Sequence, residues 1–272
     1  MNCGSEPVRF RLDLDLERFS HKCIHNHLNA GVLYEQEVSS FLVRVLRPGD
    51  VSVDVGAHIG YFSMLAAALV GPAGQVFSFE PEPGNFERLL RHARENGFSQ
   101  IQAFNMPVAA QAGEIEFFTN ADNDGGHALW DPGLHPFNQR SRVEVSKRRV
   151  AAASLDTFEP LQSRPARLIK IDTEGAEHQV LLGARRLLEE RRTPFLVAEI
   201  NTFGLHQMDS SQLALRGFAA KFGYATFVLD PDGCRPKRVR PDQIISANTT
   251  EANEVFNILF STPEAVAGFF AQ

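Results

Sequence analysis

From residue 51 onward, short apolar runs alternate with segments of helical periodicity. The candidate strands are 51–55, 75–80, 101–105, 167–172, 194–200, 224–230 and 254–261, and helical patterns occupy 59–70, 83–96, 176–191 and 210–223. Strands that alternate with helices build a parallel sheet from βαβ units. The last strand follows a long loop, which permits an antiparallel position at an edge. The sequence therefore predicts an α/β fold: a seven-stranded, mostly parallel sheet with helices on both faces.

Two segments depart from this alternation. The first 50 residues suggest two short strands and then a helix over 32–46, ended by Pro48 and Gly49. Between about 112 and 150, EIEFFTN and RVEVSKRRV alternate like hairpin strands around a segment rich in Gly, Pro, Asn and Asp. We predict an N-terminal extension, 1–50, packed on a main domain, 51–272, whose insertion at about 112–150 could serve as a lid.

Charge and composition limit the partners. The net charge of −6 is spread without long runs of one sign, which argues against a nucleic-acid partner. The three cysteines have unrelated spacings, and no apolar stretch is long enough for a signal peptide or a membrane span. A cytoplasmic protein without membrane contact is expected, acting on a small-molecule, glycan or peptide acceptor, and the N-terminal 50 residues leave room for a homodimer.

The loop VDVGAHIGYFS, 53–63, follows a strand and opens a helix. In a doubly wound sheet this turn receives a nucleotide-like ligand, and Gly56 and Gly60 allow close approach of its backbone. His58 stands where a dinucleotide fingerprint needs its middle glycine, so a nicotinamide cofactor is disfavoured. A nucleoside without a pyrophosphate, such as S-adenosyl-L-methionine, fits better.

Carboxylates at the ends of the first two strands complete this pattern. Glu80 can accept hydrogen bonds from both ribose hydroxyls, although a charge near a helix start is also favourable in itself. Asp54 can tie down loop amides or hold the ligand's amino group. The predicted cofactor site is Asp54, Gly56, Ala57, His58, Gly60, Glu80, Pro81, Asn105 and Asp172.

Several motifs in one order resemble the FkbM-type S-adenosylmethionine-dependent methyltransferases. They are GDVSVDVGAHIGYFS, FSFEPEPGNFERL, AAASLDTF, LIKIDTEGAEHQVLLGA and PFLVAEIN. The resemblance implies a Rossmann-like class I methyltransferase fold, with the cofactor over the first two strands and the acceptor near the fourth and fifth. In that family an asparagine usually stands where this chain has His58.

The segment KIDTEGAEH, 170–178, carries three carboxylates. A base that accepts the acceptor's proton has candidates in Asp172, Glu174, His178 and Glu199, and we predict Asp172, Glu174 and Glu199 as catalytic residues. Glu177, one turn into a helix, suits the helix dipole. The acids could instead gather Mg²⁺, but no neighbouring Asn or Asp completes an oxygen shell, so no metal is predicted.

Further candidates are three acceptor-side residues and one cluster of histidines. Trp130 lies in a polar loop, where an exposed aromatic often binds something, and it joins Asn201 and His206 as predicted acceptor-side residues. His21, Cys23, His25 and His27 could hold a metal, although their Asn-rich surroundings favour a loop with surface histidines.

The predicted activity is O-methylation of a hydroxyl on a sugar or secondary metabolite. Two alternatives remain open: N-methylation of an amide or amine in a modified peptide, and a non-catalytic binding protein of the same fold. The intact glycine loop and acids argue against the last.

Overall fold

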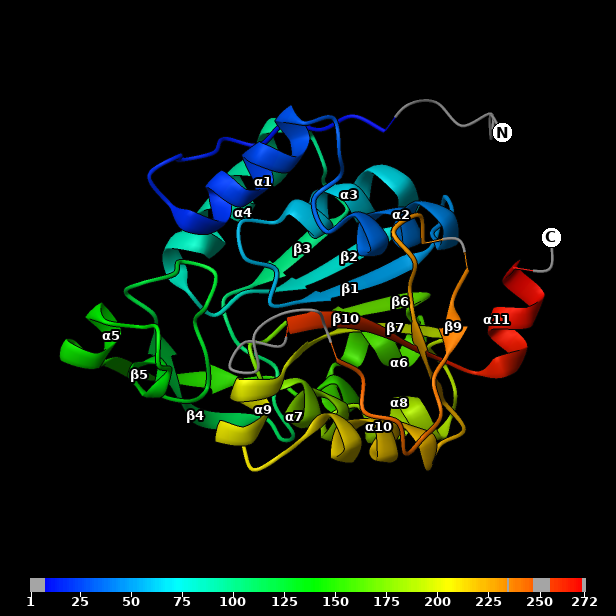
Figure 1. Cartoon of the computed structure of the whole chain (residues 1–272). Coiled ribbons are helices and arrows are strands. Elements are labelled where there is room, and N and C mark those ends of the chain that lie inside the picture. The colour runs from blue at the N-terminus through cyan, green and yellow to red at the C-terminus, as the bar shows by residue number, and fades with distance from the viewer. Residues whose placement is uncertain (1–7, 234, 247–254, 271–272) are drawn as a thin grey trace.

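A computed structural model describes residues 8–233, 235–246 and 255–270. Its central sheet has the strand order β3-β2-β1-β6-β7-β10-β8-β9 (Figure 1). The strands are β1 Val51–Val55, β2 Gln75–Phe79, β3 Ile101–Phe104, β6 Leu168–Ile171, β7 Phe195–Asn201, β8 Ala225–Val228, β9 Lys237–Arg238 and β10 Val255–Ser261. Strands β3, β2, β1, β6 and β7 are mutually parallel, and β10 is antiparallel to both β7 and β8.

Two details of the predicted sheet were wrong. The sheet has eight strands, because the short β9 adds an edge that carries no apolar run. The antiparallel last strand, β10, lies between β7 and β8 instead of at an edge. Its residues Ile258, Leu259 and Phe260 are fully buried, so this strand needs a neighbour on each side.

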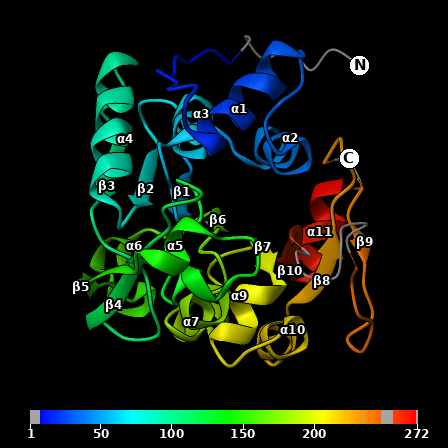
Figure 2. The same ribbon diagram turned by 60° about the vertical axis from the view of Figure 1, so that its left-hand side comes forward.

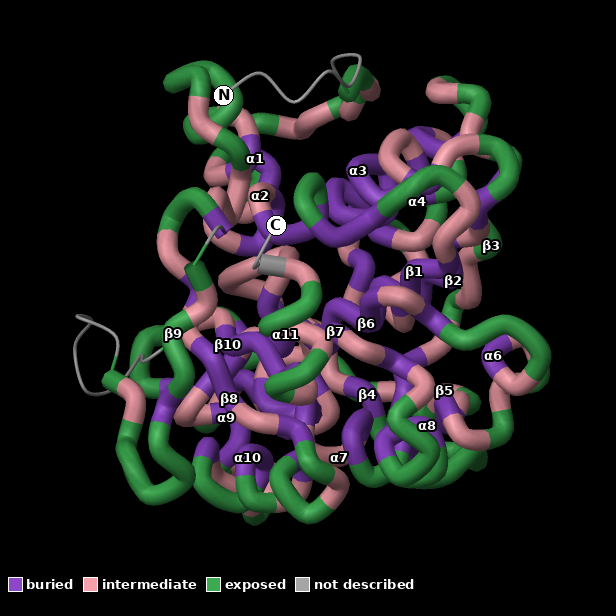
Figure 3. The backbone as a smooth tube through the Cα atoms, turned by 90° about the vertical axis from the view of Figure 1, so that its right-hand side faces the viewer, coloured by how far each residue is buried: buried purple, intermediate pink, exposed green. Residues whose placement is uncertain are grey.

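Helices cover both faces of the sheet, as predicted. In Figure 1, α1 Phe19–Asn29, α2 Gln36–Val45, α3 Tyr61–Val70 and α4 Pro83–Glu95 lie above it, and α6 Glu159–Ser163, α7 Glu177–Leu182, α8 Arg185–Glu189 and α10 Gln212–Ala220 lie below. Each face has its own apolar core, and Figure 3 shows the strands buried between them. Besides a short helix in the insertion, the described residues also form α9 Thr202–Gln207 and α11 Pro263–Phe270, with single 3₁₀ turns at Pro132–Leu134 and Leu155–Thr157.

The predicted helix over 176–191 is two helices, α7 and α8. They separate at Gly183, where a Cβ atom would come within 2.2 Å of the Ala109 carbonyl oxygen. The chain after β3 therefore passes too close for any residue other than glycine at this position. Helical periodicity alone does not reveal such an approach.

The N-terminal extension also differs from the prediction. Residues 8–50 form the helices α1 and α2 and no strand. Helix α2 buries Val38, Phe41, Leu42 and Val45, which follow helical spacing. Helix α1 covers FSHKCIHNHLN, which we expected to be a loop, and it buries only His21 and Ile24.

The insertion forms the predicted hairpin, an antiparallel pair of β4 Gly113–Thr119 and β5 Ser146–Ala152. The segment between them includes the short helix α5 Arg140–Val143. Figures 1 and 2 both show this unit at the opposite end of the molecule from α11. In the part of the chain described, no helix combines the length and the apolar character that crossing a bilayer requires.

Candidate active site

A cavity of about 1120 Å³, counted out to the solvent at its mouth, lies at the carboxyl ends of β1, β2, β6 and β7. The chain leaves β1 toward β2 on one side and places β6 on the other, so the loops after β1 and β6 diverge at this point. In open α/β sheets, ligands bind at such a switch point. Helix α1, residues 34–35 and insertion residues 123–129 form the other walls.

The glycine loop lines this cavity, but its glycines serve the protein's own packing. Gly56 has φ +79°, and a Cβ there would lie 1.7 Å from the backbone oxygen of Asp172. Gly60, at φ +92°, has Leu89 and Met64 within 3.0–3.2 Å of the equivalent point. Both glycines let the turn pack closely against the end of β6 and against α4, and Gly56 also lines the cavity, so the predicted approach of a ligand to this loop stays a prediction. Ala57 and His58 lie between them and line the cavity.

Glu80 is placed where a ribose diol could be bound. Its carboxylate is 5% exposed, lines the cavity and accepts the backbone N–H groups of His58, at 2.7 Å, and Glu82, at 2.8 Å. One N–H reaches each oxygen, so each oxygen keeps a lone pair for a further donor. Asn105 does not line the cavity; its Nδ2 donates to the carbonyls of Glu80 and Pro81 and so holds this turn. Burial raises the pKa of Glu80 to about 7.

Asp54 lies beneath the cavity wall. Its carboxylate is 2% exposed and accepts a 2.6 Å hydrogen bond from the Ser63 hydroxyl, and Asp54 is absent from the cavity lining. Its local hydrogen-bond partner is a helix hydroxyl instead of the expected loop amides, and its Oδ1 is buried without a partner, so the predicted contact with the ligand's amino group stays a prediction.

Acidic side chains gather at the ends of β6 and β7. One carboxylate oxygen from each of Glu35, Asp172 and Glu199 lies within 4.8 Å of the other two. The Lys170 ammonium is 2.8 Å from Asp172 Oδ2, and its side chain is 4% exposed. Lys170 Nζ also lies 4.3 Å from the centre of the Phe62 ring. This buried lysine already supplies a positive charge to the group.

Burial is the main cause of the raised pKa values of the glutamates in and beside this group. It raises the pKa of Glu35 to about 7, against the opposing charge of Lys170. Burial and then the charge of Asp172 raise the pKa of Glu174 to about 8, and burial holds the pKa of Glu199 well above its usual range. Burial alone would lower the pKa of Lys170, but Asp172 and Glu35 outweigh it and keep that pKa above its usual range.

Glu174 is held by residues that we predicted to contact the acceptor. Asn201 caps α9 and donates from Nδ2 to Glu174 Oε2 at 2.7 Å. Trp130 is 8% exposed and donates from Nε1 to the Glu174 carbonyl at 2.6 Å, while its ring packs on Phe203. Neither lines the cavity. The expectation of an exposed, ligand-binding Trp130 was wrong, because the polar loop around it folds back onto the turn after β6.

Glu177 is also different from our expectation of a charge suited to a helix dipole. It is fully buried, and its Oε1 accepts hydrogen bonds from the Thr173 and Gly175 amides and the Thr173 hydroxyl. Gly175 itself, at φ +108°, lets the backbone of Gly204 approach within 2.3 Å of where a Cβ would be. Glu177 is thus the internal anchor of the β6–α7 turn, and burial raises its pKa to about 7.

Two predicted histidines do not reach the cavity. His178 pairs through Nδ1 with the Ser210 hydroxyl at 2.7 Å, beside Phe218. His206 is exposed on α9. The structure therefore places neither with Asp172, Glu174 and Glu199, which all line the cavity.

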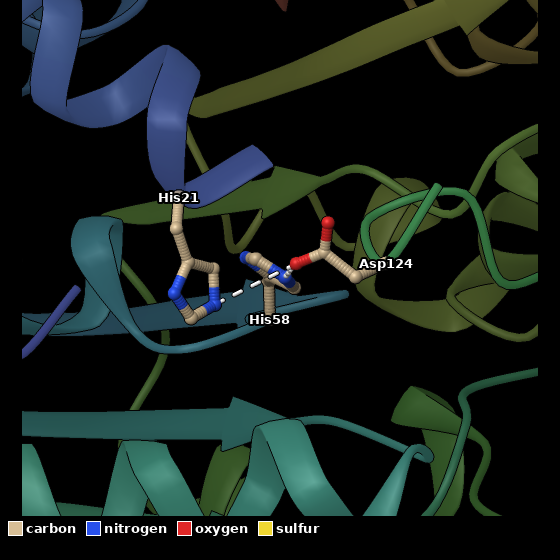
Figure 4. Close-up of side chains that lie close together, drawn as sticks. All are labelled: His21, His58 and Asp124. Atoms are coloured by element: carbon tan, nitrogen blue, oxygen red, sulfur yellow. Dashed lines mark ion pairs between the residues drawn. The ribbon is translucent and has the colours of Figure 1, made fainter. Parts of the chain in front are cut away.

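His21, His58 and Asp124 meet at the cavity mouth (Figure 4). Nε2 of His21 and Nε2 of His58 lie 3.5 and 3.4 Å from Asp124 Oδ2, and Ser20 donates its amide and its hydroxyl to the same carboxylate. The Asp15 amide donates to His21 Nδ1. The neutral His21 ring must then carry its proton on Nε2, the atom that a metal would need unprotonated.

This junction therefore fits a hydrogen-bonded contact better than a metal site. It joins α1, the glycine loop and the insertion. Of the other residues weighed for a metal there, His25 is absent from the group, and His27 Nδ1 contacts the carbonyl of Cys23, one turn earlier in the helix.

Sequence reasoning missed Glu35 and Lys170. Lys170 had a usable signal, because a lysine inside a buried apolar strand needs an acidic partner. Glu35 had none, since only the folded chain brings the start of α2 to the ends of β6 and β7.

Two features define a Rossmann-like class I methyltransferase fold. An antiparallel strand is inserted beyond β7 in the sheet order, and a buried acid stands at the end of β2. The sequence model of the methyltransferase FkbM domain matches residues 54–225. The chain belongs to this family, and the predicted cofactor, S-adenosyl-L-methionine, is confirmed with it.

Two relatives have stated activities. The chain is 24% identical over 179 residues to hexuronic acid methyltransferase AglP from Haloferax volcanii, covering 66% of this chain and 67% of that protein. It is 30% identical over 162 residues to 31-O-demethyl-FK506 methyltransferase FkbM from Streptomyces tacrolimicus, covering 51% and 60%. A solved structure of methyltransferase FkbM from Methylobacillus flagellatus superimposes with a TM-score of 0.47 at 16% identity, over 82% of this chain and 50% of that one.

Proposed function

We propose that this chain transfers the methyl group of S-adenosyl-L-methionine to a hydroxyl oxygen of a sugar or a secondary metabolite. The observation that carries the proposal is one cavity that holds both Glu80 and the acids Asp172, Glu174 and Glu199. The cofactor supplies an electrophilic methyl group when bound. Glu80 offers two free lone pairs to the ribose of the cofactor. The apolar side chains of Pro81, Val108 and Phe117 offer a surface for the adenine ring of the cofactor.

The acceptor side of the cavity suits a hydroxyl nucleophile. A hydroxyl must lose its proton during transfer, and a positioned base contributes about 10² to 10⁴ in rate. Carboxyl groups whose pKa lies near neutrality match that task, and Glu174 is one of them. One of the two relatives is named for transfer at an oxygen, 31-O-demethyl-FK506, and the other for a hexuronic acid. This combination supports O-methylation.

The test has two stages on the purified full chain. Calorimetry with S-adenosylmethionine and S-adenosylhomocysteine should show binding of both. Transfer of a deuterated methyl group is then followed by mass spectrometry with three acceptors: a hexuronic acid glycoside, a macrolide with a free secondary hydroxyl, and a peptide amine. Methyl transfer to an oxygen is expected. Exclusive labelling of the peptide nitrogen would refute O-methylation, and failure to bind the cofactor would refute the enzyme class.

A further inference from the structure

Glu35 enters the site from outside the region that the family match covers, which begins at residue 54. It is a non-glycine residue with φ 41°, in the left-handed region, at the N-cap of α2. Such backbone strain persists where the surrounding structure fixes it, and it concentrates at functional sites. The side chain is held by β10, the strand next to β7: Asn257, which pairs in register with Glu199, donates from Nδ2 to Glu35 Oε2 at 3.2 Å.

The nearby charges leave Glu35 and Glu199 without a cation of their own. Lys170 is the ammonium in the cluster, and it bonds to Asp172 at 2.8 Å. The other titratable groups that face the two glutamates are acidic or phenolic: Asp172 on β6, Glu174 in the turn after β6, and Tyr34 and Glu37 around the start of α2. Carboxylate oxygens of Glu35 and Glu199 lie within 4.8 Å of each other in this buried site, so both cannot ionise easily and the two groups hold a proton between them. The raised pKa values of Glu35 and Glu199 agree with that arrangement.

We propose that Glu35 and Glu199 form a paired proton acceptor that loses its shared proton when the cationic cofactor binds, so that the base exists only when the methyl donor is present. This inference rests on the function proposed above and names how its acceptor is deprotonated. The physical reason is that a positive charge entering the same cavity favours the ionised form of nearby carboxyls. The neutral-sulfur product lacks that charge.

The chemical step balances without any further reactant. The acceptor oxygen forms a bond to the methyl carbon, and the carbon–sulfur bond breaks with its electron pair moving to sulfur. The hydroxyl proton passes to the ionised pair of Glu35 and Glu199. When the uncharged-sulfur product remains, the pair keeps that proton, and it is expelled to solvent when the next cofactor molecule binds.

Proton counting by calorimetry tests this without knowledge of the acceptor. The full-length chain is titrated with S-adenosylmethionine at about pH 7 in two buffers that differ in ionisation enthalpy. If the pKa of about 7 at Glu35 falls by one unit, the bound fraction of that proton falls from about 0.5 to about 0.1, so about 0.4 proton is released. S-adenosylhomocysteine should release clearly less.

Two variants sharpen the experiment. Glu35→Gln should abolish most of the release while cofactor binding persists, and in the transfer assay it should lower kcat by about 10² to 10⁴. Glu37→Gln is the matched control, because Glu37 lies in the first turn of α2, accepts from the same Asn257 Nδ2 at 3.2 Å and does not line the cavity. It should still release a proton on binding S-adenosylmethionine, clearly more than Glu35→Gln does. Thermal unfolding of both variants confirms that each is folded.

The outcomes separate the two proposals. Cofactor binding without proton release, or unchanged release in Glu35→Gln, would overturn the paired acceptor and leave the methyltransferase assignment standing. Equal release with S-adenosylmethionine and S-adenosylhomocysteine would also overturn it, because the sulfonium charge would then have no part. Absence of cofactor binding would overturn both.

Discussion

Replacement of Glu177 by alanine should destabilise the fold. Its Oε1 accepts three hydrogen bonds within the β6–α7 turn, two of them from the backbone amides of Thr173 and Gly175. Alanine would leave these two amides unpaired in a buried turn, and each unsatisfied buried donor costs about 1 to 3 kcal/mol. The free energy of unfolding should therefore fall by about 2 to 6 kcal/mol. At roughly 2 °C per kcal/mol for a domain of this size, Tm should fall by about 4 to 12 °C.

The assay is thermal and urea unfolding at pH 6.5, with two comparison variants. Glu177→Gln keeps the accepting oxygen and places its amide where Oε2 has no partner, so it should stay within about 1 kcal/mol of the unmodified chain. Glu189→Ala removes an exposed acid of α8 and should change stability by less than about 0.5 kcal/mol. If Glu177→Ala were as stable as Glu189→Ala, the reasoning that Glu177 anchors the turn would be refuted.

Three further predictions concern the cavity. Gly56→Ala should lose stable folding or cofactor affinity, because its Cβ would overlap the Asp172 carbonyl at 1.7 Å. Gly71→Ala, with φ +64° but open space around it, should cost only the backbone strain of about 1 to 3 kcal/mol, and circular dichroism and calorimetry compare the two. Glu80→Gln should weaken S-adenosylmethionine binding by about 10- to 100-fold, the worth of a charged hydrogen bond, and an unchanged Kd would contradict a ribose contact. Carboxyl pKa values raised to about 7 at Glu35, Glu80 and Glu177 mean that the folded chain binds more protons than the unfolded chain above about pH 4.5. The stabilisation from these protons is lost as the pH rises through about 7, so Tm should fall between pH 6 and 8.5, and a Tm that rises over that range would contradict it.

The parts of the fold that local chemistry determines were predictable from the sequence. Buried parallel strands are continuous apolar runs, and the acid at the end of the second run, Glu80, follows from strand order alone. The parts that depend on contacts between distant segments were not predictable. The sequence of helix α1 resembles a polar loop because its buried face is only His21 and Ile24. His21 accepts from the Asp15 amide and faces Asp124, and the sequence does not place these partners.

The same reason explains the errors at the site. Glycines in a turn after a strand indicate close approach, but the sequence does not say to what, and at Gly56 the approaching group is the Asp172 carbonyl. Trp130 and Glu177 were assigned from their local surroundings, a polar loop and a helix start. Both are buried because the insertion and the β6–α7 turn pack on each other through the bond from Trp130 to the Glu174 carbonyl.

The N-terminal extension forms part of the cavity wall. The family match covers 54–225, which includes the glycine loop, Glu80 and Asp172 but excludes Glu35, α1 and β10. Yet α1 walls the cavity through Phe19, Ser20 and Cys23, and Asn257 of β10 holds Glu35 against the acids. A chain cut to the matched region would keep the cofactor loop while losing one wall and one carboxyl group of the acceptor side. Differences in acceptor among members of this family can therefore arise from the segments that lie outside the shared region.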